Sequence, residues 1–445
     1  MDDRIKIAYS WIGPKGPLWN TELPNVLSFA AATENAHVDS RFFTMDSVWN
    51  QLFSRSPDKF DMYPACSLTT DDKRPFIIPF TLFWRVDFSF YFCGRTGLLE
   101  FAHVPWHLIK LVRDENGFIL IDHGAEAFMS DHQLSAMQGY FEKIQSLPLN
   151  KIIYMIGAVN AKEVYEDFCQ RHGIPDDPKH RITIVPYPAS AYIFHRHLQN
   201  PEDEPVYDEN HIPEKLFLVW NRRYRQHRLE LALHLESLGL VDRSYISFSK
   251  VHIERPTDTF FDYAMHMNIA TTYHHVGITQ ETIRAFDSKL PLVLDDEHEI
   301  TQMCEDVNHK SRPYYQNSLV SIVTETNYSE NEVAITEKSF KPFKEKHPFI
   351  LVAGPGALKY LRSMGFKTFE EFWPETYDNG DMSPSQRMLH IRQVLELIGS
   401  WDHNQILDFK RRVKPILEHN FQVLKSLSIN NVLDDLERIV RENSK

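Results

Sequence analysis

The sequence predicts an α/β protein with two Rossmann-like domains, followed by C-terminal helices. The chain has 445 residues, more than the roughly 100–200 residues of one ordinary domain. Short β-rich apolar runs alternate with amphipathic stretches in both halves, which is typical of parallel sheets covered by helices. An acidic, proline-rich segment at 199–214, QNPEDEPVYDENHIPE, separates the two halves and indicates a domain boundary.

The first half begins with an expected strand, and expected helices and strands then alternate along it. The runs FILID and KIIYMI are almost wholly apolar, as expected of parallel strands that are buried on both faces. Thr21 is suited to cap the first helix. Strands are expected at 4–10, 37–44, 76–92, 118–122, 151–156 and 181–186, and helices at 22–32, 132–144 and 161–172.

The alternation restarts after the boundary with the apolar run KLFLVW. The helix that follows it is expected to be amphipathic, and Pro342 disturbs a later helix. Strands are expected at 215–220, 245–248, 292–295, 319–324 and 349–353, and helices at 224–238, 337–345, 356–364 and throughout the chain after Ser383. We therefore predict domains at 1–205 and 206–385, with C-terminal helices at 386–445 that pack back across the hinge.

Composition and charge argue against several classes of protein. A formal net charge of −13 works against sequence-independent binding to nucleic acid, which depends on cationic contacts to phosphate. The longest apolar stretch is interrupted by Arg85 and Asp87, so no membrane helix is predicted. The N-terminus lacks the basic and then apolar pattern of a secretory signal, and the four cysteines lie far apart. These features predict a cytoplasmic protein with reduced thiols.

The richest polar cluster follows the strand expected at 319–324. Thr336 is placed to cap the next helix, whose free N–H groups and dipole favour an anion. Lys338 and Lys341 add positive charge within one turn, which suits a diphosphate. Glu325 or Glu337 is then available to accept hydrogen bonds from ribose hydroxyls. The cluster predicts a site for a nucleoside diphosphate, although a Thr followed by an acid is also simply a good helix start.

This cluster resembles a known donor-site pattern. Thr336-Glu337-Lys338, a helix, and Pro348-Phe349-Ile350 leading to Gly354 are similar to the T-E-K…P-V…G pattern of the α-1,3-fucosyltransferases. The chain also resembles glycosyltransferase-like proteins of phages, large viruses and bacteria, which share T-E-K-x-x-K-P, P-F-I, G-F-K-T-F and the E-x-Y-D found here at 375–378.

The resemblance covers about residues 215–380 and reaches the first 200 residues by topology only. It implies the GT-B architecture, in which two α/β domains face each other across a cleft. It also implies that Glu337 and Lys338 contact a sugar nucleotide.

Four arginines stand at the turn between KLFLVW and the next helix. The carboxyl end of a strand is where open α/β sheets bind phosphates, and guanidinium groups suit them. The fucosyltransferases likewise carry an arginine after the first strand of the donor domain. Arg222, Arg225 and Arg228 are the candidates, with Arg225 and Arg228 preferred. The alternative is a solvated helix face whose arginines pair with Glu230 and Glu236.

A third cluster follows the strand FILI in the first half. Transfer with inversion requires a base that takes the proton of the acceptor hydroxyl, and a carboxylate at the end of a strand can serve. By its similarity in position to a fucosyltransferase glutamate, Glu126 is the first candidate, with Asp122 and His123 behind it. The alternative is that these are ordinary surface acids.

No metal site and no cofactor are predicted. Asp295 and Asp296 are adjacent, whereas the usual D-x-D motif separates its two carboxylates by one residue. Arginine and lysine are expected to take the place of a metal ion. A nucleotide-dependent oxidoreductase is disfavoured because no early strand is followed by G-x-G-x-x-G.

The sequence and the resemblance together predict a metal-independent, inverting glycosyltransferase, either a hexosyl- or a pentosyltransferase. Its donor is expected to be a nucleoside-diphosphate sugar, bound as substrate by the C-terminal domain. The acceptor is expected to be a glycan or a hydroxylated nucleobase in DNA, and the protein is expected in the host cytoplasm if it is viral. The alternative is a non-catalytic nucleotide-sugar-binding protein or a structural protein of the virion. The oligomeric state is not predicted.

Overall fold

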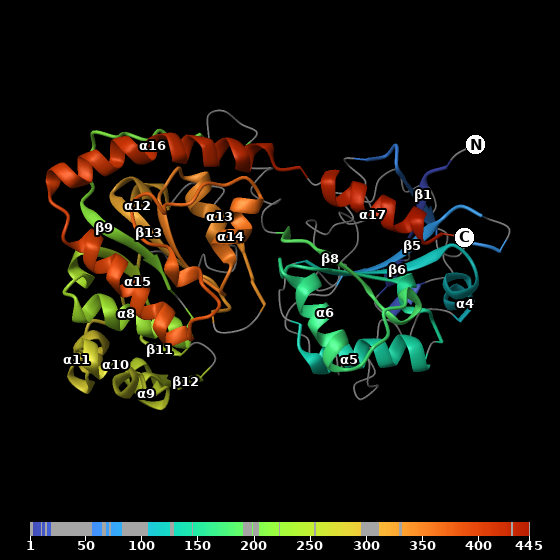
Figure 1. The fold of residues 1–445 in the computed structure, drawn as a ribbon, viewed down its shortest axis with the longest axis horizontal. Coiled ribbons are helices and arrows are strands. Elements are labelled where there is room, and N and C mark those ends of the chain that lie inside the picture. The colour runs from blue at the N-terminus through green and yellow to red at the C-terminus, as the bar shows by residue number, and fades with distance from the viewer. Residues whose placement is uncertain are drawn as a thin grey trace. The chain divides into compact units, whose positions relative to one another are not determined.

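The fold was analysed in a computed structural model of the chain. It describes residues 3–9, 11–13, 16–18, 56–64, 68–70, 73–81, 106–124, 129–144, 146–189, 198, 204–221, 223–252, 255–294, 311–328, 332–428 and 430–444. These form two compact units (Figure 1). Unit 1 comprises Met1–Ala189 and Ser428–Lys445, and unit 2 comprises Ser190–Leu427.

Unit 1 is built on a parallel six-stranded sheet. In sheet order the strands are β4 (Phe60–Pro64), β1 (Ile5–Tyr9), β5 (Phe76–Thr81), β6 (Gly117–His123), β7 (Ile152–Ile156) and β8 (Thr183–Pro186). A separate hairpin joins β2 (Trp11–Gly13) and β3 (Gly16–Leu18). Every residue of β6 and β7 is buried, as the apolar sequences of these central strands predict.

Helices cover both faces of the unit 1 sheet in the view of Figure 1. They are α4 (Trp106–Asp114), α5 (Asp131–Gly139, continued by a π-helical turn at Tyr140–Ile144), α6 (Ala161–Arg171) and α17 (Asn430–Glu442). In α5, Ser130 and Gln133 form a capping box. The last helix, α17, is held by hydrogen bonds from Lys151 Nζ to the Asn443 carbonyl (3.4 Å) and from Arg441 to the Asp3 carbonyl (3.3 Å).

Unit 2 contains a parallel four-stranded sheet. Its order is β10 (Ser244–Ser247), β9 (Lys215–Trp220), β13 (Ser318–Thr324) and β14 (Phe349–Val352). The chain leaves β9 for β10 on one side, and β13 and β14 then lie on the other side of β9. The strand order therefore reverses between β9 and β13, which is the topological switch point of this sheet.

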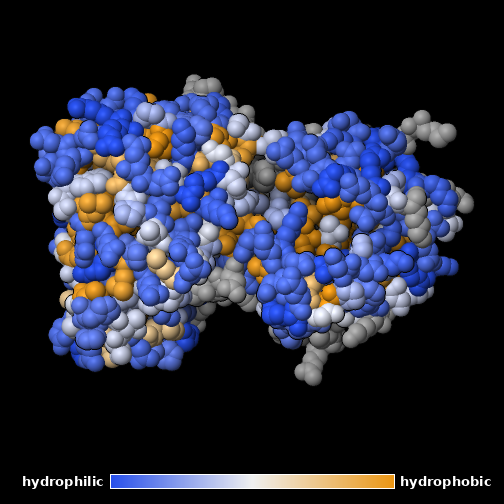
Figure 2. Space-filling model, in the orientation of Figure 1, coloured by the Kyte–Doolittle hydropathy of each residue, from blue (hydrophilic) through white to orange (hydrophobic). Residues whose placement is uncertain are grey.

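Nine helices and a hairpin surround this sheet among the described residues. The hairpin is β11 (Val251–His252) with β12 (Arg255–Thr259), and the helices are α8 (Gln226–Ser237), α9 (Phe260–His266), α10 (Ile269–Tyr273), α11 (Gln280–Asp287), α12 (Arg312–Gln316), α13 (Glu337–Lys344), α14 (Ala357–Ser363), α15 (Pro384–Gly399) and α16 (His403–Ser426). Helix α16 buries Phe409 and Val413, while its outer side is mainly hydrophilic on the face drawn in Figure 2.

The predicted α/β class with two Rossmann-like units is confirmed, and most predicted strands lie within two residues of the observed ones. Two expectations are wrong. The helix after β9 is not amphipathic, because all nine residues from His227 to Leu235 are buried. The strand expected at 292–295 is only an isolated bridge from Leu292 to Phe248. The elements expected at 22–32 and 37–44 lie outside the described residues.

The compact units place their boundary differently from the sequence. The first unit ends at Ala189, and α15 and α16 belong to unit 2 while α17 belongs to unit 1. The acidic segment is fastened within unit 2, where Lys346 pairs with Glu204 (2.7 Å) and Lys414 with Glu209 (2.7 Å). Across the described part of the chain, no helix combines the length and apolar character that a bilayer crossing requires.

Candidate functional site

The candidate site lies at the switch point of the unit 2 sheet, where the carboxyl ends of β9 and β13 are neighbours. Asn221 follows β9, and Glu325 follows β13. Open α/β sheets bind ligands at this position, because the connections diverge there and leave a crevice. Both residues are buried, so the strand ends reach into the interior of unit 2.

Arg228 occupies this switch point from the first turn of α8, and it is 6% exposed. Within the described part of the chain, its guanidinium donates only to carbonyl oxygens, among them those of Arg223 (3.2 Å) and Thr324 (3.3 Å), and its Nε finds no partner there. No carboxylate of the described residues forms an ion pair with it. Burial and the neighbouring charge of Arg225 lower the pKa of Arg228 to about 10, so it remains a cation at neutral pH. A buried, unpaired cation is costly, which favours an anionic ligand at this point.

Asn221 and His227 connect the ends of β9 and β13. The Asn221 side chain is 1% exposed; its Oδ1 accepts from Thr324 Oγ1, and its Nδ2 has no partner among the residues that the structure describes. Burial and the charge of Arg228 lower the pKa of His227 to about 3, so its ring is neutral at pH 7. His227 Nε2 lies 2.9 Å from the Glu325 carbonyl oxygen and therefore carries the proton that it donates there.

Glu325 fastens the N-terminus of α13 to the end of β13. Its carboxylate accepts from Thr336 N (2.8 Å), Thr336 Oγ1 (2.6 Å) and Ser339 Oγ (2.6 Å), and the residue has no exposed surface. Thr336 is the N-cap of α13, as predicted. The Lys338 N–H donates to Thr336 Oγ1 (3.4 Å) and the Ser339 N–H to the Thr336 carbonyl (3.1 Å), so the positive end of the α13 dipole lies at the same end of the sheet as Arg228.

Glu337 and Lys338 form a half-buried ion pair at the start of α13, with Nζ 2.7 Å from Oε1. Burial alone would lower the pKa of Lys338, but the charges of Glu337 and Glu325 outweigh it and the net pKa is raised. Burial alone would raise the pKa of Glu337, but Lys338 and then Lys341 outweigh it and the net pKa is lowered. Both groups are thus charged at neutral pH, and the Lys338 ammonium also donates to Thr336 Oγ1 (3.0 Å).

Arg387 from α15 supports the loops at the ends of β13 and β14, and no local sequence pattern indicated this role. It is 2% exposed and donates to the carbonyls of Tyr377 (2.6 Å), Tyr328 (2.9 Å) and Ala353 (2.5 Å). Its guanidinium also lies over the Tyr328 ring, which stacks on His227 at 5.2 Å between centroids. This network holds the loops on either side of α13 in place.

The E-x-Y-D residues of the resemblance have structural roles. Asp378 accepts hydrogen bonds from the backbone N–H groups of Leu358 (3.1 Å) and Lys359 (3.1 Å), so it caps α14. Glu375 accepts from Phe369 N (2.7 Å) and from Arg362 (2.9 Å). These carboxylates shape the chain that follows β14.

The acceptor-side candidates lie at the carboxyl end of β6 in unit 1. Asp122 is 5% exposed, and its Oδ1 accepts from Gly124 N (3.0 Å). His123 is 3% exposed, and its Nδ1 lies 2.8 Å from Tyr154 Oη. Burial raises the pKa of Tyr154 well above its usual value, so the phenol keeps its proton. Glu126 lies outside the described residues.

The structure brings most of the predicted donor-site residues into one region of unit 2. This region contains Arg225 (the N-cap of α8), Arg228, Glu325, Thr336, Glu337, Lys338 and Lys341. Arg222 lies outside the described residues. Sequence reasoning missed Asn221, His227, Tyr328 and Arg387. Asn221 had a usable signal, because it is the first polar residue after an apolar strand. Arg228 contradicts the alternative of a wholly solvated arginine face, because it is buried.

No protein-family model and no curated protein matches the chain.

Solved structures give distant likenesses. One is an α,α-trehalose 6-phosphate synthase from Burkholderia multivorans, with 13% identity and a TM-score of 0.40 over 90% of this chain and 81% of that chain. Another is an α,α-trehalose-phosphate synthase (UDP-forming) from Burkholderia vietnamiensis, with 14% identity and a TM-score of 0.38 over 90% and 84%. A putative UDP-N-acetylglucosamine 2-epimerase from Listeria monocytogenes shows 9% identity and a TM-score of 0.35 over 100% and 98%. Because these TM-scores are low, we base the function on the residues of this chain.

Proposed function

We propose that this chain is a glycosyltransferase whose unit 2 binds a nucleoside-diphosphate sugar at the switch point between β9 and β13. The observation that carries the proposal is Arg228, a buried guanidinium that forms no ion pair with the described residues and has a free Nε. A diphosphate at this point would supply the missing negative charge and accept the free donors of Arg228 and Asn221. The neutral amide of Asn221 adds a directional donor beside the cation.

Helix α13 supplies the second half of the proposed diphosphate site. The dipole of α13 and the charges of Lys338 and Lys341 favour an anion there. During transfer, negative charge grows on the departing diphosphate, and these cations would stabilise it without a metal ion. Glu337, whose lowered pKa keeps it ionised, is proposed to accept from the ribose hydroxyls. Glu325 is instead proposed to position α13, because its carboxylate already accepts three hydrogen bonds.

The acceptor base is proposed to come from Asp122, His123 or Glu126 in unit 1. For His123 this role requires the tautomer in which Nδ1–H donates to Tyr154 Oη, so that Nε2 can take the proton of the acceptor hydroxyl. Direct attack by the deprotonated hydroxyl would invert the configuration at the sugar. The proposed acceptor is a glycan or a hydroxylated nucleobase.

The donor site is tested by thermal unfolding of the full chain with UDP-, GDP-, ADP-, CMP- and dTDP-linked sugars. We expect one nucleotide class to raise Tm, since a ligand that binds only the folded state stabilises it. Arg228→Gln and Lys338→Met should each weaken that donor by roughly 1.5–3 kcal/mol, the range for a charge-assisted hydrogen bond. The matched control is Arg243→Gln, since Arg243 is an exposed arginine at the opposite end of the sheet that donates to the Gly399 carbonyl (2.7 Å).

Each outcome of this experiment separates the hypotheses. A shift that Arg228→Gln removes and Arg243→Gln retains supports the donor site. A shift without transfer to any acceptor, in the presence or absence of chelator, supports the non-catalytic binding protein instead. No shift with any donor contradicts the site.

A further inference from the structure

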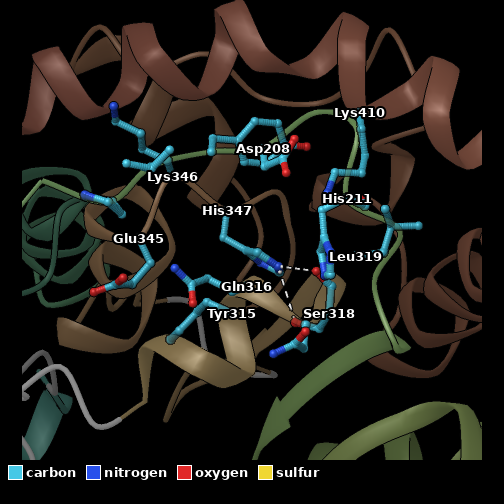
Figure 3. A pocket seen from close by; sticks show the side chains of 14 residues that line it. Asp208, His211, Tyr315, Gln316, Ser318, Leu319, Glu345, Lys346, His347 and Lys410 are labelled. Atoms are coloured by element: carbon cyan, nitrogen blue, oxygen red, sulfur yellow. Dashed lines mark hydrogen bonds between the residues drawn. The ribbon is translucent and has the colours of Figure 1, made fainter.

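A cavity of about 250 Å³ lies at the end of unit 2 opposite the candidate donor site. It is lined by Ser318 at the start of β13, by His347 just before β14, and by the segment that leads into β9 (Figure 3). The candidate donor site is formed at the carboxyl ends of the same strands. A ligand of this cavity is therefore not the proposed donor, and its binding does not depend on the proposed function.

Lys410 points from α16 toward this cavity and is 5% exposed (Figure 3). Its ammonium donates one hydrogen bond, to the His211 carbonyl (2.7 Å), and lies 5.2 Å from the centre of the Tyr207 ring. No carboxylate of the described residues forms an ion pair with it, and two of its three N–H groups have no protein acceptor there. Burial lowers the pKa of Lys410 to about 8, because water solvates this ammonium poorly.

The nearby lysines differ from Lys410 because each has a carboxylate partner. Lys346 pairs with Glu204 (2.7 Å) and with Glu418 (2.7 Å). Lys414, one helical turn beyond Lys410, pairs with Glu209 (2.7 Å). Lys410 is thus a buried cation without an ion-paired carboxylate among the described residues, and the charges of Asp208 and Glu209 act on it only from beyond ion-pair distance.

The other groups around the cavity leave room for an anion. Burial lowers the pKa of His347 to about 4, so it is neutral, and its two nitrogens are taken by Ser321 Oγ (2.9 Å) and the Ser318 carbonyl (3.0 Å). The Glu345 carboxylate is neutralised by Arg312 (2.9 Å). Asp208 lies at the exposed rim, where it accepts from Asn210 N (2.9 Å), and its charge partly offsets the effect of burial on the pKa of Lys410. The Gln316 side-chain amide lines the cavity and is not hydrogen-bonded to the described chain.

We propose that this cavity binds a small oxyanion, a carboxylate or a phosphate, with Lys410 as its counter-charge. A buried ammonium is stabilised by an anion that accepts its remaining hydrogen bonds. The volume is below that of most drug-sized pockets, which fits a small metabolite. The Tyr207 ring is placed beside the ammonium, where it would contact the apolar part of the ligand.

The test measures the affinity of the full chain for inorganic phosphate and for acetate by thermal unfolding and calorimetry, at constant ionic strength set by chloride. We expect saturable stabilisation at millimolar concentrations by one of the two anions, which identifies the headgroup. Lys410→Met keeps the length of the side chain and should weaken this binding at least about tenfold. Lys414→Met, on the same helix, should leave it unchanged.

A second variant guards against a folding defect. Gln316→Glu changes an exposed side chain without changing its size, and its carboxylate should repel the anion and weaken binding in a protein of normal stability. Equal stabilisation of the wild type, Lys410→Met and Gln316→Glu would overturn the proposal and indicate non-specific anion binding. Absence of saturable binding by either anion would also overturn it.

Discussion

At the residue scale, the chemistry of the site depends on which charges are buried and which are paired. Arg228 and Lys338 stand a short way from strand ends in the sequence, yet only Arg228 is a buried cation without an ion pair among the described residues. The sequence predicted both as phosphate ligands from their types and positions. It could not rank them, because the burial of Arg228 depends on contacts with residues about a hundred positions away in the chain, such as Thr324, whose carbonyl it contacts at 3.3 Å.

The proposed acceptor base leads to a residue-scale prediction. Glu126→Gln or Asp122→Asn should lower the turnover of sugar transfer about 10²- to 10⁴-fold, the usual contribution of a general base, while donor affinity stays unchanged. Asp122→Asn keeps an oxygen that can accept from Gly124 N, so the fold should be preserved. Turnover is measured with saturating donor, with Asp176→Asn, an exposed carboxylate in unit 1, as the control. Full activity in either variant removes that residue as the base.

At the element scale, α13 is positioned by a buried carboxylate rather than by its own capping residue alone. Thr336 caps the helix, and Glu325 holds both the N–H and the hydroxyl of that cap. Pro342 was expected to disturb this helix, but it lies inside α13, which runs for eight residues from Glu337 to Lys344. The local sequence pattern predicted where α13 begins. The hydrogen bonds that attach this helix to Glu325 at the end of β13 could be seen only in the tertiary structure.

Substitution of two glutamates at α13 distinguishes the positioning role of Glu325 from the proposed ligand-binding role of Glu337. Glu325→Gln should lower the free energy of unfolding by about 2 kcal/mol, because an amide cannot accept all three hydrogen bonds of the buried carboxylate. Glu337→Gln should change stability little, since its ion pair with Lys338 is half-exposed, but it should weaken donor binding if Glu337 contacts the ribose. Urea unfolding and donor titration of both variants give the comparison. Equal stability of Glu325→Gln and wild type would contradict the positioning role.

At the scale of the whole molecule, unit 2 contains buried histidines that must stay neutral. Burial is the main cause that lowers the pKa of His227 to about 3, of His234 to about 3 and of His347 to about 4. All three values lie below the unfolded value of about 6.5. The unfolded chain therefore binds more protons than the folded chain below that pH, so stability is lost as pH falls.

This linkage predicts that the free energy of unfolding begins to fall below about pH 6, before most carboxylates are protonated. Each of the three histidines should contribute up to about 1.4 kcal/mol of lost stability per pH unit between pH 6 and pH 4, or about 4 kcal/mol per unit together. Urea unfolding at several pH values measures the slope. His347→Gln should lower that slope by about 1.4 kcal/mol per pH unit, because one buried neutral imidazole is removed. A flat profile from pH 7 to pH 5 would contradict the prediction.

The sequence by itself determined the α/β class, the positions of most described strands and helices, and the polar cluster at Thr336, Glu337 and Lys338. These are local properties, because strands follow from apolar runs, helix starts from capping residues and periodicity, and both are written in neighbouring residues. The tertiary structure decided that α8 is buried all round, that α17 belongs to unit 1, and that Glu325 positions α13. It also decided that Arg228 and Lys410 are buried without a carboxylate partner among the described residues. Burial and charge pairing arise from side chains that only the folded chain brings together, so no local pattern could have predicted them.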